Sequence, residues 1–163
     1  MKNLKERPSR RTSARAERHQ GSIEGNAGKS SRLTTELADD HNEIVEQLNL
    51  LKATSKLVEH NSKPAVIRLQ QLFAQHCAKE ERLLYPLLGR YLNSNVCNLL
   101  TQEHEAISNI IRKAAKQFRG DGRATHWESM SELDQLLRSH FSKEENVLFW
   151  YLDVQQVYEV LSN

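Results

Sequence analysis

The sequence predicts an all-α protein: an antiparallel up-down-up-down four-helix bundle with a disordered basic N-terminal tail. Three observations predict this fold. From residue 33 onward, apolar residues repeat at helical spacing in four blocks. Only six glycines and three prolines interrupt the 163 residues, and strand signals are scarce. The connections between the blocks are short, which favours antiparallel neighbours.

Residues 1–32 form the predicted tail, and residues 33–163 form the bundle. The tail carries nine Lys and Arg against three Glu, a net charge of +6, whereas the remainder carries 14 against 18, a net charge of −4. The tail has almost no large apolar residues, so burial cannot offset the entropy lost on ordering it. A basic arm can bind nucleic acid or an acidic partner, but no aromatic residues interleave these charges. A solvated leader is the favoured interpretation.

The first two helices form one expected hairpin. The stripe of the first helix consists of Leu37, His41, Ile44, Leu48, Leu51 and Val58. Residues 61–64 break this pattern, and Pro64 is suited to open the next helix. The stripe of the second helix consists of Leu69, Leu72, Phe73, His76, Glu80, Leu83, Leu84 and Leu87. Pro86 is expected to kink this helix near its end.

The third and fourth helices form the second expected hairpin. Asn93-Ser94-Asn95 offers N-cap oxygens to the third helix, which ends at Gly120. Its stripe consists of Cys97, Leu100, His104, Ile107, Ile111, Ala114 and Phe118. The capping-box spacing of Thr125 and Glu128 starts the fourth helix. Its stripe consists of Leu133, Leu136, Leu137, His140, Glu144, Val147, Leu148 and Tyr151, and a further helical segment is expected over residues 154–161.

Polar residues replace apolar ones at mid-height on all four stripes. Each stripe carries one histidine there, and on the second and fourth helices a glutamate follows one turn later, on the same face. A buried carboxylate is costly unless a positive charge compensates it, and no Lys or Arg lies on a stripe at that level. Metal ions would supply the charge. The predicted metal ligands are His41, His76, Glu80, His104, His140 and Glu144.

An internal repeat supports this interpretation. A shift of 63 residues places Asp40-His41 on Glu103-His104, and a shift of 64 places His76-x-x-Lys79-Glu80-Glu81 on His140-x-x-Lys143-Glu144-Glu145. A single mid-stripe histidine is more often a hydrogen-bonded core residue, and a lone His-Glu pair is weak evidence. Four helices with the substitution at one level, reproduced by a repeat, indicate two facing half-sites for two metals, each with two histidines and a share in both glutamates.

The type of ligand indicates the metal. Imidazole and carboxylate without thiolate suit iron, manganese or zinc. Zinc favours closed tetrahedral sites in structural roles, whereas two bridging glutamates suit six-coordinate ions, so iron is the first choice. The expected cofactor is two iron ions (Fe2+/Fe3+) with a bridging oxo or hydroxo group, which leaves one position per metal open for a diatomic ligand.

Other polar residues near the stripes receive different interpretations. Glu81 and Glu145 lie one residue off the stripe and are expected to be solvated or to support the ligands, although either can swing in as a ligand. Tyr85 and Tyr151 can offer a hydroxyl near the site, but packing in the core or at its rim is the favoured interpretation. The two cysteines, Cys77 and Cys97, are expected to be buried free thiols. The remaining histidines, His19, His60 and His126, lie off the stripes and are excluded.

These residues resemble the hemerythrin-like, or HHE cation-binding, domain over roughly residues 33–152. The resemblance rests on four motifs: Asp40-His41, His76-Cys77-Ala78-Lys79-Glu80-Glu81 continuing into Leu84-Tyr85-Pro86, Glu103-His104-Glu105, and His140-Phe141-Ser142-Lys143-Glu144-Glu145. It implies an antiparallel four-helix bundle with a di-iron centre bridged by carboxylates and an oxygen atom. By position, the four histidines bind the irons, and Glu80 and Glu144 bridge them.

Two positions depart from the oxygen-carrying hemerythrins. Those proteins have a second histidine where this chain has Ser108, and an aspartate where it has Glu145. The chain is more similar to the four-histidine, two-glutamate branch, which includes iron-sensing domains and bacterial proteins that repair iron centres after nitrosative stress. The repair proteins also carry an N-terminal cysteine-bearing domain, and no cysteine precedes Cys77 here.

Three classes of function follow from the sequence. The leading hypothesis is a di-iron protein that binds or senses O2, NO or iron. The second is an enzyme or repair factor that reduces peroxide or NO or restores iron-sulfur centres. The third is a metal-free helical interaction module. No apolar run approaches the length of a membrane helix, and no signal-peptide stretch is present, so the expected location is the cytoplasm, with no membrane partner. The oligomeric state is left open.

Overall fold

The computed structural model describes residues 13–54, 63–117 and 123–162. All regular elements in these ranges are helical, and the predicted all-α bundle of four rods is confirmed. The first rod is α1 (Ser13–Thr54), and the third is α4 (Ser94–Gln117). The second rod consists of α2 (Lys63–Lys79), the π-helix η1 (Glu80–Leu84) and α3 (Tyr85–Leu88). The fourth rod consists of α5 (Arg123–Lys143), the π-helix η2 (Glu144–Phe149) and α6 (Trp150–Leu161).

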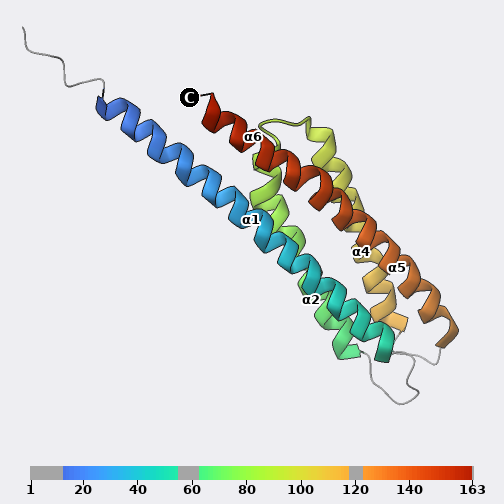
Figure 1. Cartoon of the computed structure of the whole chain (residues 1–163). Coiled ribbons are helices and arrows are strands. Elements are labelled where there is room, and N and C mark those ends of the chain that lie inside the picture. Colours follow the sequence, from blue (N-terminus) through green and yellow to red (C-terminus); the bar gives the residue numbers. More distant parts are fainter. Residues whose placement is uncertain (1–12, 55–62, 118–122, 163) are drawn as a thin grey trace, which may run out of the picture.

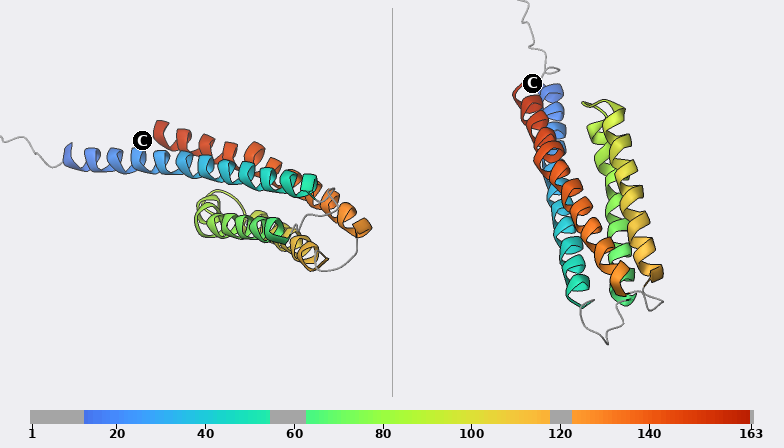
Figure 2. Two further views of the ribbon diagram at one scale, coloured as in Figure 1. Left: turned by 90° about the horizontal axis from the view of Figure 1, so that it is seen from below. Right: turned by 90° about the vertical axis from the view of Figure 1, so that its right-hand side faces the viewer.

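The four rods close a ring. Helix α1 packs on α2, α2 on α4 and α4 on α5, and both α5 and α6 return to α1 (Figure 1). In Figure 2, α1 and the α5–α6 rod form one layer, while α2 and α4 form the other. The N-terminal part of α1 projects past the other three rods (Figures 1 and 2). Sequential neighbours run antiparallel, as short connections between long helices require.

Helix α1 begins well before the predicted start of the bundle. It starts at Ser13, so residues 13–32, whose composition predicts disorder, continue the first helix; residues 1–12 lie outside the described residues. The composition argument concerns burial, which is not needed to lengthen an existing helix. Nucleation is the costly step, and each added residue then gains one backbone hydrogen bond. Extension from the bundle therefore accounts for the helical part of this segment.

The predicted helix ends agree with the structure in part. The backbone N–H of Asn95 donates to Oδ1 of Asn93 at 3.0 Å, which confirms the N-cap of α4. Helix α5 starts at Arg123, two residues before the predicted capping box, within the usual uncertainty of helix ends. Pro86 lies in the first turn of α3, directly after η1, where its missing N–H costs least. Val58, Phe118 and Gly120 lie outside the described residues.

The core divides into two apolar clusters with a polar layer between them. The cluster toward the α1–α2 connection contains Ile44, Leu48, Leu51, Val66, Leu69, Leu72, Phe73, Ile107, Ile111, Ala114, Met130, Leu133, Leu137 and Phe141. The cluster at the other end contains Leu33, Leu37, Leu84, Tyr85, Leu88, Leu100, Leu148, Phe149 and Leu152. Each fully buried leucine contributes about 1.5–3 kcal/mol of transfer free energy, so packing above and below holds the polar layer in place.

The two π-helical segments rotate the stripes below the polar layer. Leu83 and Val147, which α-helical spacing places in the core, are 40% and 56% exposed. The buried positions after Glu80 are instead residues 84, 85 and 88, and after Glu144 they are residues 148, 149 and 152. A π-helix has more residues per turn than an α-helix, so the chain advances one residue before the same face returns to the core. Leu136, at the flank of its stripe, is also exposed.

Candidate metal centre

The six predicted ligands lie together in the polar layer. All four rods contribute: α1 carries His41, α4 carries His104, and the other two rods each carry a histidine at the end of an α-helix and a glutamate at the start of a π-helix. Every one of these residues is at most 4% exposed: His41, His76, Glu80, His104, His140 and Glu144. The register of four amphipathic helices has thus brought four imidazoles and two carboxylates into one enclosed space.

Each glutamate reaches histidines on two rods. One carboxylate oxygen of Glu80, Oε2, lies 3.4 Å from Nε2 of His76 on its own rod and 3.1 Å from Nε2 of His104 on α4. Glu144 is placed in the same way, with Oε1 3.1 Å from Nε2 of His140 and Oε2 3.3 Å from Nε2 of His41. Donor atoms that share one ion stand roughly 3 Å apart, because metal–nitrogen and metal–oxygen bonds are each about 2 Å long.

The histidines form two pairs, one from each hairpin. The ring centroids of His41 and His76 are 4.7 Å apart, and those of His104 and His140 are 4.8 Å apart. Ligand atoms of the first pair, together with one from each glutamate, all lie within 4.8 Å of one another. A second such group contains the His104–His140 pair with Glu80 and His76. We call the space beside His41 and His76 the first position and the space beside His104 and His140 the second position.

An outer carboxylate faces the Nδ1 atom of each histidine. Glu145 accepts a hydrogen bond from Nδ1 of His41 at 2.7 Å, and Glu103 accepts one from Nδ1 of His140 at 2.9 Å. Glu81 lies 3.5 Å from Nδ1 of His104, and Asp40 lies 3.8 Å from Nδ1 of His76, beyond hydrogen-bond distance. A carboxylate only accepts hydrogen bonds, so the ring proton stays on Nδ1 and the lone pair of Nε2 is turned toward the centre.

Two lysines, on the second and fourth rods, neutralise the outer carboxylates of the first and third rods. Lys79 donates to Asp40 at 2.6 Å, and Lys143 forms an ion pair with Glu103. Burial raises the pKa of Glu103, but hydrogen bonds from Lys143 and His140 outweigh it and hold the pKa below its usual value. Burial also raises the pKa of Asp40, but the nearby ring of His76 and the hydrogen bond and charge of Lys79 hold this pKa below its usual value. Both lysines therefore pair with carboxylates at the rim of the layer, and neither compensates the charge of the central glutamates.

The central polar atoms lack partners within the described protein. Eight buried side-chain nitrogen and oxygen atoms have no hydrogen bond: Nε2 of His41, Nδ1 and Nε2 of His76, Nε2 of His140, and both oxygens of Glu80 and of Glu144. Leaving one buried polar group unsatisfied costs about 1–3 kcal/mol, and more for a charged one. Apart from Nδ1 of His76, which carries the ring proton, these atoms are imidazole lone pairs and carboxylate oxygens without a donor among them, and such a set fits a cation.

The pKa shifts in the protein without metal also indicate that the polar layer lacks a positive charge. Burial, and then the nearby charge of Glu80, raise the pKa of Glu144 far above its usual range. Burial, and then the neighbouring His76 and His140, lower the pKa of His41 to about 2. Burial lowers the pKa of His140 to about 4, although its hydrogen bond to Glu103 acts in the opposite direction. The layer therefore disfavours charge of either sign until a cation balances the carboxylates.

Sequence reasoning underestimated the residues around the six predicted ligands. Tyr85 packs in the core, as favoured, and its hydroxyl also lies 3.4 Å from Nε2 of His104, which matches the alternative that the sequence left open. Asp40 and Glu103 were not singled out as partners, although each directly precedes a histidine and the repeat reproduces both. Glu81 and Glu145 face histidine rings from half-exposed positions, so of the roles considered for them, support of the ligands matches the geometry.

Neither cysteine is among the side chains that group as possible metal ligands in the described part of the chain. Cys77 and Cys97 are free, as predicted, but both are half-buried rather than buried. Cys77 packs against the cluster toward the α1–α2 connection, and burial raises the pKa of its thiol strongly. His60 lies outside the described residues, and the side chains of His19 and His126 belong to helical segments whose side chains are not described.

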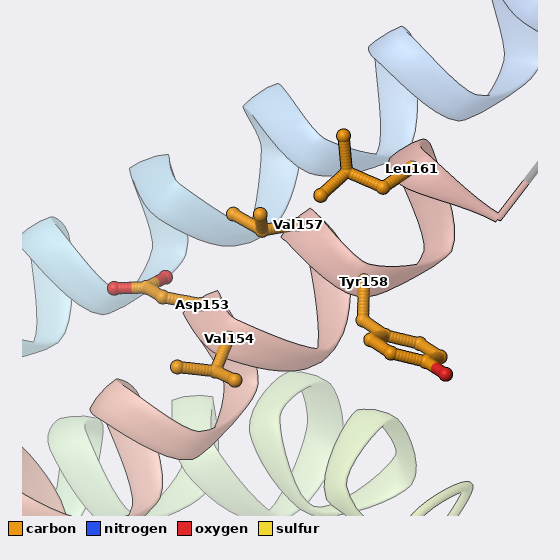
Figure 3. A pocket seen from close by; sticks show the side chains of 5 residues that line it. All are labelled: Asp153, Val154, Val157, Tyr158 and Leu161. Carbon is orange, nitrogen blue, oxygen red and sulfur yellow. The ribbon is translucent and has the colours of Figure 1, made fainter.

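A separate pocket of about 310 Å3 lies on α6, beyond the polar layer. It is lined by Asp153, Val154, Val157, Tyr158 and Leu161 (Figure 3). Three of these side chains, those of Asp153, Val157 and Leu161, lie on the side of α6 that faces α1 in Figure 3. One carboxylate among apolar side chains is too few donors for a metal site, so this pocket is not part of the centre.

Neither the curated proteins nor the solved structures gave a match to this sequence. Among the described residues, no helix is long and apolar enough to cross a membrane. The sequence model of the hemerythrin HHE cation binding domain matches residues 32–159, which include parts of all four rods and the whole polar layer. The chain therefore belongs to the hemerythrin HHE cation binding domain family.

Proposed function

We propose that this chain is a non-haem di-iron protein that binds a diatomic ligand, O2 or NO, at a centre of four histidines and two glutamates. The observation that carries the proposal is the set of eight buried nitrogen and oxygen atoms without hydrogen-bond partners, which converge in one layer. Two cations among these atoms would satisfy the lone pairs and balance both carboxylates. Imidazole and carboxylate ligands suit iron, and the family binds cations through this domain.

Each protein group has a defined part in this proposal. The Nε2 atoms of His41 and His76 hold the first ion and those of His104 and His140 the second, while Glu80 and Glu144 reach both. The outer carboxylates keep each ring proton on Nδ1, which fixes the orientation of the ring. Iron in such a site would supply a redox-active Lewis acid with an open coordination position.

The burial of the centre limits the size of its ligand. With every predicted ligand at most 4% exposed, an organic substrate cannot reach the metal positions without opening the bundle. A diatomic molecule can cross a helical bundle through small side-chain motions, on the timescale of rotamer changes. The enclosure therefore favours O2 or NO over larger substrates.

The proposal predicts two irons per chain and a visible response to gas. Protein prepared without chelator, loaded anaerobically with ferrous iron and desalted, should retain about two irons by elemental analysis. Addition of O2 or NO should then change the visible spectrum. Retention of no iron would contradict the centre and support a metal-free interaction module. Two retained irons with no response to either gas would contradict the binding of O2 or NO but would leave the di-iron centre standing.

An enzymatic role is tested with the same preparation. Turnover of hydrogen peroxide, or of NO with a reductant, by the iron-loaded protein would support the alternative of a di-iron enzyme. Restoration of activity to a damaged iron-sulfur protein would support a repair factor. Stoichiometric binding without turnover supports the binding or sensing role proposed above.

Replacing Glu103 by alanine should weaken metal binding about 10–100-fold, the usual effect of removing an outer partner of a ligand. The change removes the acceptor of the His140 Nδ1–H and frees Lys143, but it leaves all six proposed ligands in place. Competition with a chelator of known affinity measures the effect. Glu105→Ala is the matched control, because Glu105 is exposed and only two residues away. Equal affinities in the two variants would contradict the assigned role of Glu103.

A further inference from the structure

The internal repeat makes the two halves of the centre comparable residue by residue, and they differ at one polar group. The 64-residue shift that relates Glu80 to Glu144 also relates Tyr85 to Phe149. Both aromatic rings lie nearly parallel to a histidine of the centre: Tyr85 to His104, with centroids 6.1 Å apart and an angle of 14°, and Phe149 to His41, at 5.8 Å and 15°. The two positions are thus alike in shape, but only one carries a hydroxyl.

The hydroxyl of Tyr85 points into the second position. It lies 3.4 Å from Nε2 of His104, and Nε2 itself lies 3.1 Å from Oε2 of Glu80. Tyr85 is only 9% exposed, so its hydroxyl is largely shielded from bulk water. A buried tyrosine hydroxyl needs a polar partner, and here that partner is the imidazole nitrogen.

Metal binding removes that partner. The lone pair of His104 Nε2 accepts the hydrogen bond of Tyr85 in the protein without metal, and the same lone pair is the one an ion at the second position would take. The hydroxyl would then be buried without an acceptor, unless it turned to the ion itself. Its distance from Nε2 is close to the separation of roughly 3 Å expected for two donors to one ion, so little movement is needed.

We propose that Tyr85 is a further oxygen ligand of the metal at the second position, and that the two metal positions are therefore chemically different. The phenolic oxygen forms a bond to the metal, and its proton is released to solvent. Phe149 offers no such donor at the first position, which keeps its open coordination site. The inference rests on the proposed di-iron centre and deepens it, because it assigns the external ligand to the first position, beside His41 and His76.

The neighbouring side chains share this asymmetry. Phe141 stacks on His41 with centroids 3.9 Å apart and an angle of 11°, and the same 64-residue shift relates it to Cys77. The first position is thus flanked by two phenylalanines, whereas the second has Tyr85 beside His104, with the ring of Phe73 edge-on to the same histidine at 5.8 Å. The apolar walls of the first position suit an uncharged diatomic molecule, and the second position is the more polar of the two.

The test uses the iron-loaded full chain, oxidised to the ferric state with ferricyanide, which takes up the electrons. A phenolate bound to ferric iron absorbs strongly in the visible, and resonance Raman excitation of that band shows tyrosine ring modes. We expect the wild-type protein to show both signals and Tyr85→Phe to lose both while it retains two irons. Removal of this ligand should also weaken one of the two metal-binding steps by at least about tenfold.

A swap of the two side chains provides the matched control. The double variant Tyr85→Phe, Phe149→Tyr should regain the tyrosine signals, now at the first position, and should lose the response to O2 or NO there. Wild-type protein that holds two ferric ions without tyrosine ring modes would overturn the assignment of Tyr85 and leave the di-iron centre standing. Failure to retain iron at all would instead count against the centre itself.

Discussion

Replacing Glu80 and Glu144 together by leucine should abolish metal binding and yet stabilise the protein prepared without metal by about 1–4 kcal/mol. Both carboxylates are fully buried, and neither has a hydrogen-bond partner among the described residues. Leucine has a similar volume, and it continues the apolar clusters above and below the layer. The variant removes a burial cost that only a bound cation compensates in the natural sequence.

Chemical denaturation in the presence of a chelator measures this difference, and elemental analysis measures the metal. Glu46→Leu serves as the control, because Glu46 is exposed on α1 and its replacement leaves the centre unchanged. A double variant that still held two metals would exclude the glutamates as ligands. A double variant less stable than the metal-free wild type would show that the carboxylates are satisfied in some other way.

The same pair of proteins should respond oppositely to metal. Metal that binds only the folded chain stabilises it by about 4 kcal/mol when the free ion is a thousandfold above its dissociation constant. The wild-type protein should gain this stability on addition of ferrous iron, whereas the double variant should gain none. Because the helices pack through the two apolar clusters, both proteins should remain helical without metal.

Without metal, the free energy of unfolding should be greatest near pH 6.5 and should fall on both sides. The folded protein keeps His41 and His140 neutral, with pKa values of about 2 and 4 against 6.5 for the unfolded chain. The unfolded chain therefore takes up more protons below pH 6.5, and acid lowers stability. Glu144 acts in the opposite direction: its pKa is raised above the ordinary 4.5, so the folded chain holds a proton that the unfolded chain loses.

The slopes follow from proton linkage, which gives about 1.4 kcal/mol per pH unit for each group that differs in protonation. From pH 6.5 to about 8, below the range in which the thiol of Cys77 titrates in the unfolded chain, the raised pKa of Glu144 sets the slope, so stability should fall by up to about 1.4 kcal/mol per unit. Between pH 4.5 and 6.5 the two histidines outweigh Glu144, so stability should rise with pH. Denaturation curves collected at several pH values with chelator present measure both limbs.

Two controls separate the groups. Glu144→Gln should flatten the alkaline limb, because the side chain no longer titrates, and should leave the acid limb in place. Iron-loaded protein should lack the alkaline decline, since bound carboxylates are already ionised and metal affinity rises with pH. Constant stability from pH 6.5 to about 8 in the metal-free wild type would show that Glu144 is ionised in the folded protein and would contradict the buried, uncompensated site.

The local sequence pattern was sufficient to predict the four helices and the height of the polar layer along them. His41 lies between Leu37 and Ile44, and His104 lies between Leu100 and Ile107, in each case at helical spacing. This spacing indicates helices rather than strands. The 63- and 64-residue repeats then place the four histidines at one height, and the structure gathers them there. The extension of α1 back to Ser13 was not predicted, because it depends on an existing helix end rather than on burial.

The sequence by itself determined the apolar stripes as far as the polar layer and the polar side chains that share this layer, because both follow from periodicity along single helices. It did not determine the buried positions beyond the layer, where Leu83 and Val147 are exposed. Only the tertiary structure decided what those side chains meet. The π-helical turns at Glu80 and Glu144, the contact of Glu145 with His41, and the hydroxyl of Tyr85 beside His104 depend on how separate rods approach one another. Spacing along one helix carries no information about the distance to the next, and that distance is set by packing.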